Sequence, residues 1–317
     1  MKLHLAPLAG FTDAPFRLMC FEGGADMAYT EMVSAAGLAH GSSPTHHLME
    51  MLPGEGDVAC QIFGAKESDV AYAAKVATET GRFCELNLNA GCPMQKVTRE
   101  GAGAKLIESP HKIELLLKAM AENTNLPVTL KTRLGPHPGE TNVFKIAEAA
   151  QRAGAKGLII HARYTSQMHG GKVHLDRLEE LVRSTSLPVT GNGSVTNAQE
   201  LAAMASCGVK AVMIGRAALA RPSIFAELKG DTLATSSKLE ECRRLLEYIL
   251  AFREQLACAF PNDHIPSVDG FASVKMHTHL FRYFNGRPGA AALRARLNTV
   301  RTLAEIREII ANEECNN

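Results

Sequence analysis

Short apolar runs recur along the first two thirds of the chain, and stretches with helical periodicity separate them. The apolar runs are centred near residues 5, 30, 60, 87, 131, 160, 190 and 213. The amphipathic stretches between them include 68–80, 111–123, 142–154 and 197–208, and the last two end on a glycine, as expected at a helix C-cap. Eight strands alternating with helices predict a parallel (β/α)8 TIM barrel.

A doubly wound open sheet is the competing α/β arrangement, but the G-x-G-x-x-G fingerprint is missing after the first expected strand. From about Asp231 the strand signal stops, and 237–260 begins a run of helical patterns that continues to the last residue. We therefore expect a catalytic barrel over residues 1–230 and a small all-helical domain over residues 231–317.

Composition and charge narrow the setting. The chain has 317 residues, of which 46% are hydrophobic and 21% charged, enough to bury a large core. No run approaches the ~20 apolar residues of a membrane span, and residues 1–10 show no signal-peptide architecture, so we expect a cytoplasmic protein. We also expect a monomer. The eight cysteines lack zinc-ligand spacing, which predicts no structural metal. With a formal net charge of +1, a polyanion partner would need a local basic patch.

Polar residues share one face of several expected strands. Because side chains alternate along a strand, Glu85, Asn87 and Asn89 lie on one face, and Leu86 and Leu88 lie on the other. The apolar face is expected against the helices and the polar face inside the barrel. The same parity puts five further polar side chains in the interior: Gln61, Lys131 with Arg133, and His161 with Arg163.

Two explanations of this polar interior stay open. Barrel interiors normally hold branched aliphatic residues, and Lys or Arg is seldom buried without a partner. An internal ion-pair network, for instance Lys131 with Glu85, would orient the barrel and do nothing else. A ligand site is the other explanation, because the polar set clusters toward the carboxyl ends of the strands, where barrel enzymes have their active sites.

The ends of the last two expected strands carry glycine turns, "TGNGSVT" and "MIGRAALARP". The corresponding loops of such barrels commonly bind phosphate through backbone N–H groups. Gly191, Gly193 and Gly215 permit close approach of the backbone, and Arg216 adds positive charge. Beside a polar interior, this pattern predicts a phosphorylated cofactor.

Cys92 stands between a glycine and a proline where the strand near residue 87 ends. The interval from this strand to the next is the longest in the expected barrel, and long loops in compact domains are usually functional. A thiol, with an ordinary pKa near ~8.5, is mostly protonated at neutral pH and can act as a general acid or, once activated, as a nucleophile. A packed loop cysteine without a chemical role is the alternative.

Eight sequence blocks occur in order across the expected barrel: "APLAGFTDAPFR" (6–17), "TEMVSA" (30–35), "QIFG" (61–64), "LNAGCPMQKV" (88–97), "LKTRLG" (130–135), "IHAR" (160–163), "GNG" (191–193) and "IGRAALARPSIF" (214–225). Together they resemble the tRNA-dihydrouridine synthase family, and more narrowly its bacterial B-type branch. The helical tail also resembles the RNA-binding domain of that family.

The resemblance implies FMN at the barrel mouth, NADPH as reductant and tRNA as substrate. The flavin passes hydride to C6 of a flipped uridine, and by motif match Cys92 donates a proton to C5, with Asn89 at the uracil or the flavin. The implied flavin contacts are the backbone of Pro7, Leu8 and Ala9, the ring ligands Gln61, Lys131 and His161, and the phosphate cradle Asn192, Gly193, Ser194, Gly215 and Arg216.

Two positions depart from the family pattern. After His161 the chain reads Ala162, Arg163, Tyr164 and Thr165, where the family commonly has Gly-Arg-Thr-Arg. Arg163 keeps the family's arginine and is expected at the substrate, but the RNA contacts of this loop are altered. Residue 87 is Asn where the family often has Asp, so a charge is lost there.

Between Phe271 and Ala304 the chain has six basic residues and no Asp or Glu: Lys275, Arg282, Arg287, Arg294, Arg296 and Arg301. Such one-sided charge favours an RNA-binding surface, and we expect Arg287, Arg294 and Arg296 to contact tRNA. Two other classes stay open. An FMN barrel that reduces a free pyrimidine or another small enone needs no basic tail, and a non-catalytic RNA-binding protein needs no polar interior.

Overall fold

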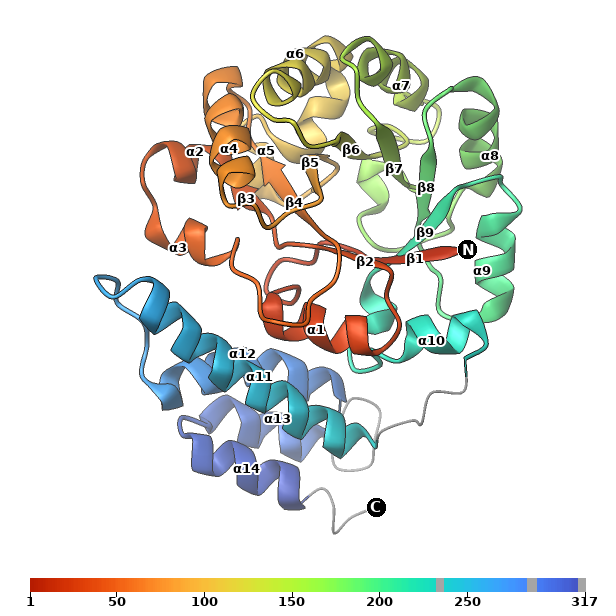
Figure 1. Ribbon diagram of the computed structural model, residues 1–317. Helices are drawn as coiled ribbons and strands as arrows, with labels where there is room; N and C mark the ends of the chain where they lie inside the picture. Colours follow the sequence, from red (N-terminus) through yellow and green to blue (C-terminus); the bar gives the residue numbers. More distant parts are fainter. Residues whose placement is uncertain (232–236, 284–289, 313–317) are drawn as a thin grey trace.

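The computed structural model describes residues 1–231, 237–283 and 290–312, and it shows a closed barrel followed by a group of helices (Figure 1). All strand pairings in the barrel are parallel, in the order β2-β1-β9-β8-β7-β6-β5-β4-β3, and β2 also pairs with β4, which closes the sheet. The strands are β1 (Lys2–Leu5), β2 (Met27–Tyr29), β3 (Val33–Ser34), β4 (Val58–Phe63), β5 (Glu85–Ala90), β6 (Val128–Arg133), β7 (Gly157–His161), β8 (Val189–Asn192) and β9 (Ala211–Ile214). The predicted TIM barrel is confirmed.

The single strand expected near residue 30 is two short strands, β2 and β3, that pair with β4 in different registers. Ala28 lies opposite Val58, whereas Val33 lies opposite Ile62, so one extra residue is present between the two strands. An extra residue in one strand is a bulge, which bends the strand and re-aims side chains. Glu31, within the bulge, accepts a hydrogen bond from the backbone N–H of Gly10.

Helices cover the outside of the barrel between successive strands (Figure 1). They are α1 (Ala14–Glu22), α2 (Ala35–Ala39), α3 (Ser43–His47), α4 (Glu67–Glu79), α5 (Gln95–Thr98), α6 (Pro110–Ala121), α7 (Val143–Arg152), α8 (Leu175–Ser184), α9 (Ala198–Ala205) and α10 (Ile224–Lys229). Helix α1 begins after Asp13, whose side chain accepts the N–H of Phe16, and Pro15 occupies its first turn. The buried faces of these helices and the outward faces of the strands form one continuous apolar core.

The register of the sheet confirms the predicted parity of the interior. Asn89 lies opposite Lys131, Arg133 lies opposite His161, and His161 lies opposite Asn192. Neighbouring residues in register share a face of a parallel sheet, so these side chains all point to one face. Leu86 and Leu88, on the other face of β5, are fully buried in the core against the helices.

Four further helices, α11 (Lys238–Ala259), α12 (Val268–Tyr283), α13 (Ala290–Thr299) and α14 (Leu303–Asn312), lie together beside α1 (Figure 1). Helix α11 begins with a capping box in which Ser237 and Glu240 satisfy each other's backbone N–H groups. Its buried face packs on α1 and α12. The boundary expected between residues 230 and 231 lies next to the undescribed segment 232–236. None of the helices in the described part of the chain is long and apolar enough to cross a membrane.

Candidate active site

The polar interior of the barrel contains a chain of hydrogen bonds that runs in one direction. The amide of Asn89 donates to Gln61 (2.8 Å), the amide of Gln61 donates to Asn87 (2.7 Å), and the amide of Asn87 donates to Thr129 (2.8 Å). The Thr129 hydroxyl then donates to Glu85 (2.5 Å). Because each amide uses its oxygen to accept from one side and its nitrogen to donate to the other, the chain fixes the orientation of all three.

Glu85 ends this chain, and it also accepts a hydrogen bond from the Tyr29 hydroxyl (3.1 Å). Burial raises the pKa of Glu85, while the hydrogen bonds from Thr129 and Tyr29 oppose the rise. Within the described residues, Glu85 forms no ion pair with Lys131, so the internal ion pair considered for these two residues is wrong. Asn87, where the family often has Asp, acts here as both donor and acceptor, a role that a carboxylate cannot fill.

The loop that carries Cys92 is fixed to the end of β5 from both sides. The side-chain oxygen of Asn89 accepts the N–H of Gly91 (3.1 Å) and of Cys92 (3.0 Å), and the Cys92 carbonyl accepts the N–H of Ala104 (2.8 Å). Gly103 has φ +59°, and a Cβ there would lie 2.6 Å from the Cys92 carbonyl oxygen. The half-buried thiol therefore sits on a backbone that packing and hydrogen bonds hold in place.

Two cations lie close to Cys92. Burial, followed by the charge of Arg133, lowers the pKa of Lys131 to about 7, while Cys92 partly opposes this effect. The Lys131 ammonium donates to the side-chain oxygen of Asn192 (3.2 Å). Such a lysine can change its protonation state near neutral pH and respond to a developing negative charge.

Arg133 joins the Cys92 loop to the loop after β7. Its guanidinium donates to the carbonyls of Gly91 (2.8 Å) and Met168 (2.7 Å), and burial lowers its pKa to about 10. Arg133 is not among the expected site residues, although it shares the parity of Lys131 on the same strand, which is the sequence signal that points to it.

His161 is neutral and has a fixed tautomer. Arg163 donates to its Nε2 (3.1 Å), and since a guanidinium has no acceptor, the ring proton is on Nδ1. Burial, and then the charges of Arg133 and Lys131, lower the pKa of His161. Arg163 also donates to the Ser194 hydroxyl (2.6 Å). The structure thus places Arg163, expected at the substrate, beside the expected phosphate cradle.

The ends of β8 and β9 form a narrow cradle beside these cations. Gly193 has φ +130°, and a Cβ there would lie 2.9 Å from Val173 and 3.1 Å from the His161 ring. Ser194 also has a positive φ, of 54°. The side-chain amide of Asn192 donates to the Met213 carbonyl (2.8 Å), which fixes the start of the turn.

The charge of the cradle is one-sided. Within the described residues, none of Lys131, Arg133, Arg163 and Arg216 forms an ion pair with a carboxylate. Arg216 is exposed and donates to the His169 carbonyl (2.8 Å), and Gly215 before it approaches Ala6. A site in which several basic side chains converge, with no acidic side chain to neutralise them, is suited to bind an anion such as a phosphate.

The segment Pro7, Leu8 and Ala9 forms a tight turn at the barrel mouth. The N–H of Ala6 donates to the Ile214 carbonyl (2.8 Å), which places the start of the turn beside β9. The Leu8 carbonyl accepts the N–H groups of Phe11 and Thr12, both at 3.0 Å. Pro7 and Leu8 are half-buried, and Ala9 is exposed.

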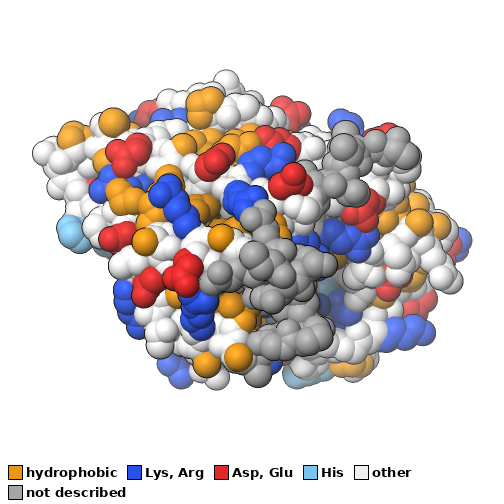
Figure 2. Space-filling model, turned by 90° about the horizontal axis from the view of Figure 1, so that it is seen from below, with side chains coloured by type: hydrophobic (Ala, Val, Ile, Leu, Met, Phe, Trp, Pro, Cys, Tyr) orange, Lys and Arg blue, Asp and Glu red, His pale blue; other side chains and the backbone are white. Residues whose placement is uncertain are grey.

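The basic residues of the helical segment are partly balanced by acids from elsewhere in the chain. Lys275 pairs with Asp13 of the barrel, and Arg296 pairs with Glu308 of α14, both at 2.8 Å. Arg294 is exposed, with its guanidinium 5.7 Å from the Phe281 ring centroid. Arg287 lies outside the described residues. The face of the molecule seen from below mixes Lys and Arg with Asp and Glu (Figure 2).

Comparison with known families fits this geometry. The family model described as Dihydrouridine synthase (Dus) matches residues 4–316. The chain belongs to the dihydrouridine synthase family. It is 35% identical over 250 residues to tRNA-dihydrouridine synthase B of Klebsiella pneumoniae and of Escherichia coli K12, an alignment that covers 77% of this chain and 78% of each relative. The resemblance stated from the sequence blocks is confirmed.

Solved structures with the same barrel include two of low sequence identity. Morphinone reductase is 14% identical, with a TM-score of 0.54, over 73% of this chain and 86% of that one. The old yellow enzyme homologue from Zymomonas mobilis is 11% identical, with a TM-score of 0.53, over 76% and 91% of the two chains. At these identities the likeness shows that this dihydrouridine synthase family member shares their barrel fold.

Proposed function

We propose that this protein reduces the C5=C6 bond of a uridine in tRNA, with FMN as the bound flavin, NADPH as the reductant and Cys92 as the acid that protonates C5. One observation carries the proposal: Asn89 holds the Cys92 loop beside Lys131 and Arg133, at the same end of the barrel as the cation cradle. Membership of the dihydrouridine synthase family supports the reaction. The reductant and the identity of the flavin are inferred from the family resemblance.

The residues present fit FMN. Gly193 has φ +130° and no side chain to hinder the approach of an anion to its backbone, and the cations around it have no carboxylate partner among the described residues. In this proposal the phosphate is held by Asn192, Gly193, Ser194, Gly215 and Arg216, and the ring is held by the backbone of Pro7, Leu8 and Ala9 with Gln61, Lys131 and His161. When bound and reduced, FMN supplies the hydride that adds to C6 of the uracil.

The chain's own residues supply the proton and control its position. The Cys92 thiol gives its proton to C5, which becomes negative as C6 gains hydride, and the thiolate that remains regains a proton from solvent. Lys131 and Arg133, both close to Cys92, stabilise that thiolate. Asn89, through the N–H groups of Gly91 and Cys92, keeps the thiol in reach of the base.

We propose residues 1–230 as the catalytic domain and 231–317 as the tRNA-binding domain. A uridine within folded tRNA must leave the stack, at a cost of a few kcal/mol that contacts to the surrounding RNA offset. The exposed Arg294 is suited to such a contact, as Arg287 and Arg296 are proposed to be. We further propose that the protein works as a monomer in the cytoplasm, where tRNA is available.

The test uses the purified full-length protein. Its bound flavin is identified by mass spectrometry, and the visible absorbance of the flavin is followed after addition of NADPH or NADH under anaerobic conditions. Dihydrouridine is then measured in an unmodified tRNA transcript and in free uridine. We expect about one FMN per chain, faster bleaching by NADPH, and product in tRNA alone. Protein that does not take up FMN, or that reduces free uridine as well as tRNA, would contradict the proposal.

A further inference from the structure

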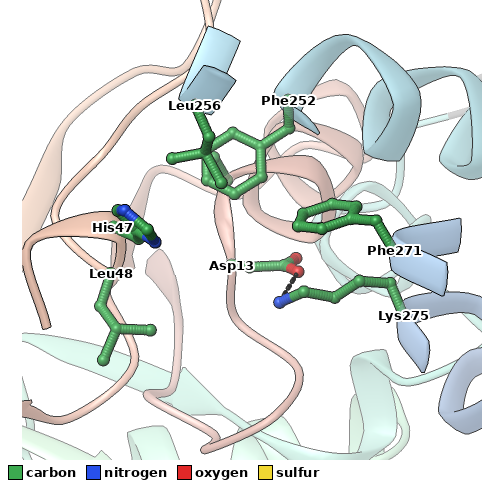
Figure 3. Close-up of a pocket in the computed structure, with 8 residues that line it drawn as sticks. Asp13, His47, Leu48, Phe252, Leu256, Phe271 and Lys275 are labelled. Atoms are coloured by element: carbon green, nitrogen blue, oxygen red, sulfur yellow. Dashed lines mark ion pairs between the residues drawn. The ribbon is translucent and has the colours of Figure 1, made fainter. Parts of the chain in front are cut away.

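One face of α12 contacts the loop between β1 and α1, residues 6–13, which contains the proposed flavin segment. Lys275, His279 and Arg282 are four and three residues apart, a spacing that places them on one side of a helix. The Lys275 ammonium lies 2.8 Å from the Asp13 carboxylate (Figure 3). The His279 ring meets the Phe11 ring edge-on, with centroids 5.6 Å apart, and the Arg282 guanidinium lies 5.8 Å from the same ring.

Lys275 is the cation that balances a buried acidic pair under this loop. Asp13 is 6% exposed and caps α1, and Glu31 is 8% exposed and accepts the N–H of Gly10. Burial by itself raises the pKa of Asp13, but the charge of Lys275, followed by His279 and by the hydrogen bonds from Lys275 and the Phe16 N–H, outweighs it and leaves the pKa lowered. The pKa of Glu31 is raised by burial and then by Asp13, and Lys275 opposes this rise.

The nearby Arg17 does not replace Lys275, because its guanidinium is occupied elsewhere. It donates to both carboxylate oxygens of Glu55, at 2.6 and 3.1 Å, and to the Thr12 carbonyl at 3.0 Å. In the described part of the chain, Lys275 is the only ion-pair partner of Asp13. Removal of the Lys275 charge therefore leaves a buried carboxylate without its counter-ion, a change that is strongly destabilising.

The ion pair borders a cavity instead of a closely packed wall. A pocket of about 160 Å³ lies between the barrel and the helices, and Phe252, Leu256 and Phe271 line it together with the pair (Figure 3). Because the pocket lies on one side of this contact, close packing does not hold α12 against the loop there. The contact therefore depends on a few specific groups. The helices also have separate attachments to the barrel, including His47 with Asp263 (2.8 Å) and Tyr248 with Glu22.

We propose that Lys275 is a positioning residue for the β1–α1 loop, so that helix α12 of the RNA-binding domain sets the conformation of the segment that holds the flavin. The proposal rests on the proposed function for two assignments, that of this loop to the flavin and that of the helical segment to RNA binding. Its consequence is a physical link between the two domains: a change in α12 on RNA binding is transmitted through Asp13 and Phe11 to the turn at Pro7, Leu8 and Ala9.

The first measurement needs no cofactor. Amide hydrogen exchange of residues 6–13 is followed in the flavin-free full chain for the wild type, Lys275→Met, Lys275→Arg and the control Tyr248→Phe, which removes an attachment of the same helices at the opposite end of α1 from the loop. We expect exchange at Leu8 and Gly10 to be roughly tenfold faster in Lys275→Met, partly restored in Lys275→Arg and unchanged in the control. Unchanged exchange in a folded Lys275→Met, or equal acceleration in Tyr248→Phe, would overturn the proposal.

The second measurement uses FMN affinity and the tRNA reaction. We expect Lys275→Met to weaken FMN binding roughly tenfold and to lower kcat at saturating tRNA, because the defect lies in the flavin loop. A rise in KM for tRNA alone, with normal exchange, would show Lys275 to be an RNA contact and overturn the proposal. If the wild type binds no FMN, the proposed function fails while the exchange experiment still decides the role of Lys275.

A second variant covers the case in which Lys275→Met does not fold. Asp13→Asn keeps an oxygen that can cap α1 but removes the charge, and the double variant Asp13→Asn/Lys275→Met leaves no unpaired charge at this pair. We expect each change to accelerate exchange of the loop, and the double variant to show less than the product of the two single effects. Fully multiplicative effects would mean that the two residues act independently, against the proposal.

Discussion

The side-chain oxygen of Asn89 accepts the backbone N–H of Cys92 at 3.0 Å. The same amide donates to Gln61, which begins the hydrogen-bonded chain that ends on Glu85 inside the barrel. A residue of β5 thereby connects the rigid interior to the loop that carries the proposed acid. The position of the thiol is a property of the barrel and not of the loop alone.

Asn89→Ala should disorder the Cys92 loop. Two N–H groups lose their acceptor, at a cost of roughly 1–3 kcal/mol for each one left buried and unsatisfied. We expect faster alkylation of Cys92 by iodoacetamide and at least tenfold less dihydrouridine formation. Asn197→Ala removes a similar side-chain cap from α9 and should change neither quantity. Normal turnover in Asn89→Ala would show that the loop is held without this side chain.

Gly103→Ala should damage the same loop from the other side. The added Cβ would lie 2.6 Å from the Cys92 carbonyl oxygen, and the position has a positive φ. Gly101→Ala is the matched control, because Gly101 also has a positive φ, of 77°, but the nearest atom to its Cβ is 3.5 Å away. We expect both variants to lose stability in urea unfolding, and Gly103→Ala alone to lose most of its activity. Equal activity in the two would contradict this role for Gly103.

Lys131 should make stability depend on pH. Its pKa is about 7 in the folded protein and near ~10.4 when unfolded, so between these values the unfolded chain holds more protons and stability rises with pH. Below about pH 7 the full cost of the buried charge is present. In the flavin-free protein, Lys131→Met should therefore be more stable than the wild type at pH 6, and this advantage should shrink by pH 9. Urea unfolding at both pH values tests this, and a difference that does not vary with pH would contradict it.

Arg294 should contribute to the salt dependence of tRNA binding. It is exposed, and the removal of one phosphate contact reduces the slope of log affinity against log salt by about 0.7–0.9. Arg296→Ala should have a smaller effect, because Glu308 already pairs with that guanidinium. Arg183→Ala on α8, where Glu179 is the partner, serves as a control on the barrel surface. An unchanged slope for Arg294→Ala would place the tRNA elsewhere.

The barrel and the polar interior were predictable from periodicity. Strict alternation in β5 and β6 separates the core-facing leucines from Asn87, Asn89 and Lys131, and the register of the sheet brings these polar residues together. The split of the second strand was not predictable, because the alternation of apolar and polar residues in "MAYTEMV" gives no sign of an extra residue near Glu31. The bulge depends on pairing with β4 and on the contact of Glu31 with Gly10, which are tertiary.

The helical tail shows the limit of reading charge along a sequence. An acid-free segment forms a basic surface only when no acid from elsewhere in the chain pairs with its cations, and here two such acids do. Asp13, far away in the chain, pairs with Lys275, and Glu308, from the next helix, pairs with Arg296. Such long-range pairs leave no local signal, so the structure is needed to separate residues free to meet RNA from residues that join the domains.

The most direct test of the account is dihydrouridine formation by Cys92→Ala with the flavin already reduced. The account predicts that this variant binds FMN and is bleached by NADPH like the wild type, yet forms dihydrouridine in tRNA ~10²- to 10⁴-fold more slowly, as expected when a general acid is removed. Near-normal product formation by Cys92→Ala would contradict it, and would make Cys92 a structural residue of its loop.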